Sequence, residues 1–164
     1  MSSSFEVPEI DHLTTGAVGP PGQRIFYLQA GHGAQVVSLR LEKAQVAALV
    51  AYLAGMLADM PPPGEITTTG MELIEPVVAE WVVASLGVSY DEDADRVVIL
   101  AEELVEEGEE PARARITATR EQVAALSVRG AEAVAGGRPP CPLCGQPLDA
   151  QGHTCPRLNG HRER

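Results

Sequence analysis

Residues 45–49 read Gln-Val-Ala-Ala-Leu, and residues 122–126 repeat the same five amino acids. Each copy lies just inside a predicted helix, over about 42–60 and about 119–135. The first helix is predicted by apolar residues at 3.6-residue spacing, and the second by a capping-box pattern at its start. One pentapeptide at the same place in two helices indicates that the chain contains two copies of one structural unit.

The segments that precede the helices have the apolar patterns of strands. Strands are predicted over 24–30 and 36–41 in the first half, and over 81–90, 96–101 and 112–118 in the second. Because the order of elements agrees with the repeated pentapeptide, we expect an α+β fold. Two strand-strand-strand-helix units would share an antiparallel sheet, with both helices on one face.

The expected domain organisation follows from composition. The duplicated body should occupy residues 1–135, with halves at about 1–64 and 65–135. Residues 136–140, Gly-Gly-Arg-Pro-Pro, have the composition of a linker. Residues 141–164 would then form a separate small module.

This module contains every cysteine of the chain, Cys141, Cys144 and Cys155. A C-x-x-C spacing lets two thiolates bind one metal ion from a tight turn, and His153 is expected as the fourth ligand, with His161 in reserve. A redox C-x-x-C is typical of a helix start after a strand, which this tail does not resemble. Since four protein ligands leave no open position, we expect one structural zinc ion in a small zinc ribbon or knuckle.

Charge is distributed unevenly along the 164 residues, whose net charge is −11. From residue 138 onward, Arg138, Arg157, Arg162 and Arg164 outnumber two acidic residues, so the remainder carries −13. An acidic body repels phosphate backbones, and 4% aromatic residues offer few stacking partners for bases. Weak nucleic-acid binding through these arginines is therefore only a third hypothesis.

The acidic residues Asp91, Asp93, Asp95 and Glu102 have the spacing of calcium-loop positions 1, 3, 5 and 12. Arg96 stands where that loop needs glycine for its sharp turn, and the flanking segments read as strands. A solvated hairpin tip is the interpretation that we favour.

An enzyme or small-ligand-binding protein with a site between the duplicated halves is the second hypothesis. Arg24 and Arg96 lead corresponding strands and could bind a phosphate or carboxylate, with His12 and His32 as further candidates. Strand-end salt bridges are the simpler interpretation of the two arginines. No nucleophile and base stand at a recognisable spacing, so we expect no catalytic residues.

Several longer segments are similar to a known family. They are residues 18–24, 26–30, 41–43, 95–98, 137–144 and 152–160. Together they resemble an uncharacterised actinobacterial family, described only as a domain of unknown function, with a CPxC…GHxCPR tail. The resemblance implies association with a phosphatidylinositol-kinase-like protein and a histidine-phosphatase-type protein similar to phosphoglycerate mutase. It implies no activity and no catalytic residues.

These observations favour a non-enzymatic zinc-binding adaptor or accessory protein that acts with a protein partner. The first ten residues lack the basic and apolar regions of a signal peptide. No stretch approaches the ~18 uninterrupted apolar residues of a membrane span. We therefore expect a soluble, cytoplasmic protein without a membrane partner.

Overall fold

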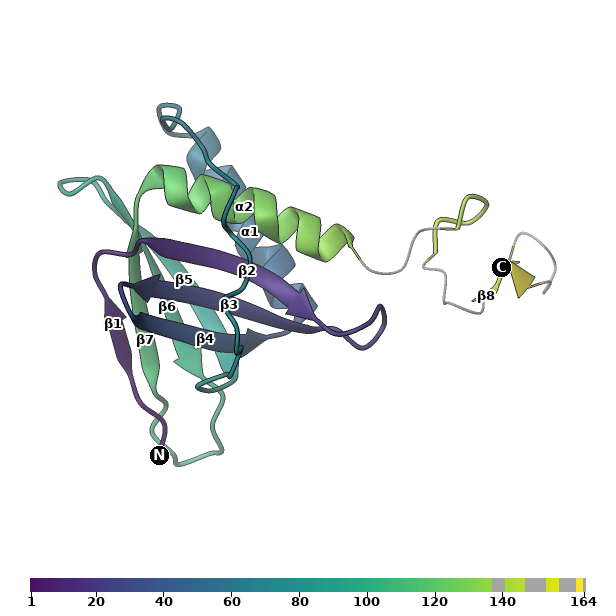
Figure 1. Cartoon of the computed structure of the whole chain (residues 1–164), viewed down its shortest axis with the longest axis horizontal. Coiled ribbons are helices and arrows are strands. Elements are labelled where there is room, and N and C mark those ends of the chain that lie inside the picture. The colour runs from purple at the N-terminus through teal and green to yellow at the C-terminus, as the bar shows by residue number, and fades with distance from the viewer. Residues whose placement is uncertain (137–140, 147–152, 157–161, 164) are drawn as a thin grey trace.

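The structure of the chain is a computed structural model that describes residues 1–136, 141–146, 153–156 and 162–163. In Figure 1 the helices lie along one side of a strongly curved set of strands. In chain order the elements are β1 (Phe5–Val7), β2 (His12–Val18), β3 (Ile25–His32), β4 (Gln35–Leu41), α1 (Lys43–Ala58), β5 (Val83–Asp91), β6 (Arg96–Glu103), β7 (Arg113–Ala118), α2 (Arg120–Ala135), β8 (His153–Thr154) and β9 (Arg162–Glu163).

The body contains two copies of one unit. Strands β2, β3 and β4 form an antiparallel meander that leads into α1, and β5, β6 and β7 form a second meander that leads into α2. The predicted α+β fold of two strand-strand-strand-helix units is thus confirmed. The sequence pattern had indicated only two strands before α1, and the missing one is β2.

The expected shared sheet is divided into a three-stranded sheet, β2-β3-β4, and a four-stranded sheet, β1-β7-β6-β5. They meet at a single parallel bridge between Arg40, in β4, and Val82, just before β5. Beyond this bridge α1 lies beside β5, and no further pairing joins β4 to β5 in the described residues. The corresponding junction of the other unit is the parallel pairing of β7 with β1, just before β2.

The repeated pentapeptide has the same role in both helices. Gln45 and Gln122 each occupy the third helical position and close a capping box with the N-cap residue, Glu42 or Thr119. The side-chain amide oxygen of each glutamine accepts the N-cap backbone N–H, at 2.7 Å for Gln45 and 2.8 Å for Gln122. Each box satisfies amide groups that a helix start otherwise leaves without partners.

The same two glutamines also join the units to each other. Gln45 donates its amide N–H to the carbonyl of Val83 at 3.0 Å, at the start of β5. Gln122 donates to the carbonyl of Ile10 at 2.8 Å, just before β2. Each helix start is therefore bonded to the other unit at or just before its first strand, which is the relation expected of a pseudo-twofold pair.

The connection between the units, residues 59–82, forms no helix or strand and crosses the outer face of β2-β3-β4. Buried Thr14 donates its hydroxyl to the carbonyl of Met71. The amide of buried Gln29 exchanges two hydrogen bonds with the backbone of Ile74, at 2.8 and 3.1 Å. The connection thus satisfies polar groups that burial would otherwise leave unpaired.

Candidate metal centre

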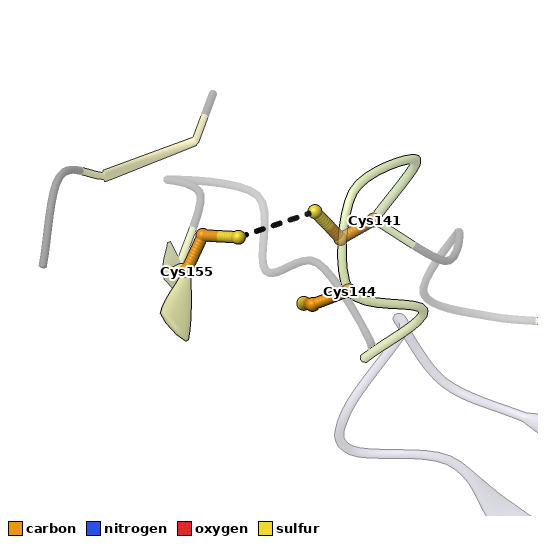
Figure 2. A group of neighbouring side chains, drawn as sticks. All are labelled: Cys141, Cys144 and Cys155. Carbon is orange, nitrogen blue, oxygen red and sulfur yellow. Dashed lines mark hydrogen bonds between the residues drawn. The ribbon is translucent and has the colours of Figure 1, made fainter. Parts of the chain in front are cut away.

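The first two cysteines lie on a turn that begins at Cys141. The backbone N–H of Gly145 donates to the carbonyl of Cys141 at 2.9 Å, and that of Cys141 donates to Gln146 at 2.8 Å. Gly145 has a φ of 76°, a conformation that disfavours any side chain. This closed turn directs Cys141 and Cys144 toward the same point (Figure 2).

The third cysteine approaches the same point from the end of β8 (Figure 2). The sulfur atoms of Cys141, Cys144 and Cys155 all lie within 4.8 Å of one another, and Cys141 and Cys155 are separated by 3.9 Å. A disulfide would need about 2.05 Å. Tetrahedral Zn–S bonds of about 2.3 Å place two sulfurs about 3.8 Å apart, so the observed separation matches that of two ligands of one ion.

The surroundings of Cys141 favour its thiolate. Burial acts most strongly, and by itself would raise the pKa of the thiol. Backbone N–H groups of Cys144 and Leu143, together with the thiols of Cys144 and Cys155, hydrogen-bond to the sulfur and outweigh burial, so that the pKa of Cys141 lies below its ordinary value. A thiol is deprotonated when it binds a metal, and the same N–H groups would stabilise the bound thiolate.

The backbone of the expected fourth ligand, His153, pairs with Glu163 in the short ladder of β8 with β9. This places the residue two positions before the buried sulfur of Cys155. The side chain of His153 and the whole of His161 lie outside the described residues, as do Arg138, Arg157 and Arg164. The choice of His153 as fourth ligand therefore stays a prediction.

The two arginines proposed for a ligand site do not converge. Arg24 donates to the carbonyl of Ala133, near the last turn of α2. Arg96 donates to the carbonyl of Asp95 at 2.9 Å, and the carboxylate of Asp95 binds Arg120, the first residue of α2. Thirteen residues of helix, at 1.5 Å each, separate these positions by about 20 Å. One small ligand cannot contact both arginines.

The histidine candidates lie near the start of β2. His32 is mostly exposed, with Nδ1 3.9 Å from a carboxylate oxygen of Asp11. His12 contacts the side-chain oxygen of Gln29 through Nε2 at 2.8 Å. Neither is placed against a serine, cysteine or arginine by the bonds of the described residues.

The acidic hairpin between β5 and β6 contains a network that the sequence did not predict. Asp95, with a φ of 52°, accepts hydrogen bonds from the hydroxyl of Tyr90 at 2.5 Å and the guanidinium of Arg120 at 2.9 Å. Both hydrogen bonds lower the pKa of Asp95, and the bond from Tyr90 lowers it more than the bond from Arg120 does. Arg120 also donates to the carbonyl of Pro61 at 2.6 Å. Asp95 thus serves as a structural link, which agrees with a hairpin tip.

Two grooves, one on each side of the pair of helices, were also not predicted from the sequence. The first, of about 300 Å³, lies between α2 and β2 and is partly lined by residues 65–71. The second, of about 490 Å³, lies between α1 and β5. Each is formed by the helix of one unit and the first strand of the other. The signal in the sequence was the repeated pentapeptide, since Gln45 and Gln122 line corresponding walls.

Comparison with known families supports the resemblance to an uncharacterised domain family. The family model described as "Protein of unknown function (DUF3090)" matches residues 5–155, which includes all three cysteines. No curated protein and no solved structure matches the chain significantly. Neither of the helices described is long and apolar enough to cross a bilayer.

Proposed function

The chain belongs to the DUF3090 family, and from that premise we propose that it is a zinc-binding, non-enzymatic accessory protein of the cytoplasm. The observation that carries this proposal is the convergence of three cysteine sulfurs within 4.8 Å. Soft thiolate ligands, with imidazole as the fourth, select zinc over the harder cations that prefer oxygen. Cys141, Cys144, Cys155 and His153 would hold the ion.

The role of the ion would be structural. Four protein ligands close a tetrahedral shell, and a catalytic zinc needs a position for water or substrate. The described residues of the tail include two strands of two residues each, which form a ladder that is too small to be stable alone. Metal ligation would supply the folding free energy that this ladder lacks.

An accessory role is supported by the placement of the other candidate residues. Arg24 binds a backbone carbonyl near the last turn of α2, and Arg96 binds the backbone carbonyl of Asp95 in the β5–β6 hairpin. The two histidines contact neighbouring side chains. We infer that the protein acts by binding a protein partner. The family resemblance suggests the kinase-like and phosphatase-like proteins as the first partners to test.

Metal analysis of the full chain, purified without chelator, tests the zinc site. We expect one zinc per chain, and loss of the metal in Cys144→Ser. His153→Ala should release zinc, whereas His161→Ala and the matched control His32→Ala should retain it. Release of zinc by His161→Ala alone would transfer the fourth position to that residue.

Two results together would contradict the proposal: a native protein without bound metal, and three thiols that react fully with a thiol reagent before unfolding. For the accessory role, the chain would be mixed with each of the two proposed partners and analysed by size-exclusion chromatography. Elution as separate species at both low and physiological salt would remove that partner from consideration.

A further inference from the structure

Strand β5 has an open edge that carries no charge before its last residue, Asp91. It pairs with β6 along one side, and no second strand pairs with it among residues 1–136 beyond the bridge at Val82. Residues 82–90 contain no charged side chain. Proteins usually protect such an edge with lysine, proline or a covering segment, because its backbone groups can accept another strand. From Ser85 to Tyr90 the open edge of β5 has none of these, whereas at its start the register shifts between Val83 and Ser85, and Gln45 donates to the carbonyls of Val83 and Ala84.

The edge borders the apolar groove of about 490 Å³ between β5 and α1. Ala48, Leu49 and Tyr52 of α1 form one wall, and Leu86 and Val88 of β5 form the other. The side chain of Tyr52 is 58% exposed, and residues 44–58 of α1 include no charged side chain. An uncharged hollow beside an open strand edge, on a body of net charge −13, is typical of a surface that a partner covers.

The other half of the molecule shows what fills such a groove. The corresponding hollow lies between α2 and β2, where Gln122 and Ala125 take the places of Gln45 and Ala48. There an irregular segment of the same chain, residues 65–71, forms a third wall, and Met71 on it is buried. Within the described residues, no equivalent segment lines the groove beside β5.

We propose that the groove between α1 and β5 binds an extended segment of a partner protein, which adds to the edge of β5. This inference rests on the accessory role proposed above. Uncharged residues of the partner would lie over the groove, with one apolar side chain against Tyr52. Such strand addition takes affinity from backbone hydrogen bonds and specificity from alternate side chains.

The charges at both ends of β5 define the flanks of that segment. Asp91, Glu92 and Asp93 stand at the end of the strand. At its start, Glu102 and Glu103 of β6 lie opposite Ser85 and Val83. Because Arg113 binds Glu102 at 3.0 Å, Glu103 at the start of β5 and residues 91–93 at its end are the carboxylates that complement basic residues on both sides of the partner's uncharged centre.

The same charges disfavour a second copy of this chain as the occupant. Two β5 strands paired antiparallel would bring Asp91 and Glu92 of each copy toward Glu102 and Glu103 of the other. Because Glu102 and Glu103 lie one strand further in, these carboxylates would be about 10 Å apart, close enough for like charges to repel at low salt. A basic-flanked segment avoids this repulsion, and its binding should weaken as salt concentration rises.

Selection from a display library of random 12-residue peptides on the full, metal-loaded chain tests the proposal. Recovered peptides should have an uncharged centre of alternating apolar residues and Lys or Arg on both flanks. Fluorescence anisotropy of two recovered peptides then compares Ala48→Lys, which points a charge into the groove, with Ala54→Lys. Both alanines are exposed on α1, but only Ala48 lines the groove.

We expect Ala48→Lys to weaken peptide binding about tenfold or more, because a charge in an apolar groove is desolvated or displaces the ligand. Ala54→Lys should leave binding within about twofold of the parent, as exposed substitutions usually do. Glu92→Lys should reduce the preference for basic flanks. Thermal melting of each variant confirms that it is folded.

The proposal is overturned if the library yields no binder, if the binders have acidic flanks, or if Ala48→Lys and Ala54→Lys act alike. It is also overturned if light scattering shows a dimer that Ala48→Lys dissociates, because the groove would then be an interface between copies. Zinc analysis separates this test from the metal site: Ala48→Lys should keep its zinc, and Cys144→Ser should still bind the peptides.

Discussion

Replacing Gly130 with alanine tests the packing that joins the two units. Gly130 lies in the middle of α2 and is buried where this helix faces α1 and β2. A Cβ atom at this position would lie 2.3 Å from Cγ2 of Val50, in α1, and 3.3 Å from Cγ2 of Thr15, in β2. The first distance is far inside van der Waals contact, so one of the helices must shift or Val50 must leave its rotamer.

Two opposing contributions determine how Gly130→Ala changes the free energy of unfolding. Alanine is a better helix former than glycine by about 1 kcal/mol, which favours the variant. Overpacking a well-packed site costs about 1–3 kcal/mol, and valine in a helix has one strongly preferred rotamer and cannot easily turn away. We therefore expect a net destabilisation of about 1 kcal/mol. In a Val50→Ala background the clash with Val50 is absent and the milder 3.3 Å approach to Thr15 remains, so the same substitution should stabilise by about 0.5–1 kcal/mol.

Urea unfolding of the four proteins of this double-mutant cycle, followed by the fluorescence of buried Trp81, measures the effect. The coupling between the two positions should be about 2 kcal/mol, well above the few tenths found for independent sites. Stabilisation by Gly130→Ala in both backgrounds would refute the close approach of α1 and α2 at this residue.

Three further predictions concern individual contacts. Asp95→Asn should have a lower free energy of unfolding than the parent at neutral pH. Because the pKa of Asp95 is lowered in the folded state, the ionised carboxylate stabilises the parent at pH values above the ordinary carboxyl pKa. This stabilisation disappears as the pH falls through the lowered, folded-state pKa. Urea midpoints between neutral pH and about pH 3 measure it, and a difference independent of pH would contradict the network with Tyr90 and Arg120. Gln45→Ala and Gln122→Ala should each lower the free energy of unfolding by about 1–2 kcal/mol, since each loses a capping bond and a bond to the other unit; an effect in only one helix would argue against their equivalence. Cys144→Ser should remove protection of the tail amides from hydrogen exchange while the melting temperature of the body is unchanged, and a lowered melting temperature would show that the tail supports the body.

Much of the fold was accessible from the sequence because it depends on residues close together in the chain. The helix starts at Glu42 and Thr119 are determined by glutamines three residues later. The alternation of apolar residues in β7 marks its buried face, and the repeated pentapeptide indicated the duplication. Strand β2 was missed because its buried residues include consecutive threonines, Thr14 and Thr15, which interrupt the apolar pattern.

The candidate metal site likewise combines a local feature, predictable from the sequence, with one that depends on the tertiary structure. The C-x-x-C turn at Cys141 is local, and its spacing alone indicated a metal ligand pair. That the sulfur of Cys155 reaches within 3.9 Å of Cys141 depends on how the residues between them fold.

Other features depend on contacts between residues that lie far apart in the chain. The bond from Gln122 to Ile10 joins residues 112 positions apart, and that from Arg120 to Asp95 joins residues 25 apart. The division of the strands into two sheets, and a groove that is lined by the chain in one half and open in the other, belong to the same class. Local propensities act over a few residues along the chain, whereas these contacts depend on how twisted strands and packed helices bring distant segments together, and only the tertiary structure determines that.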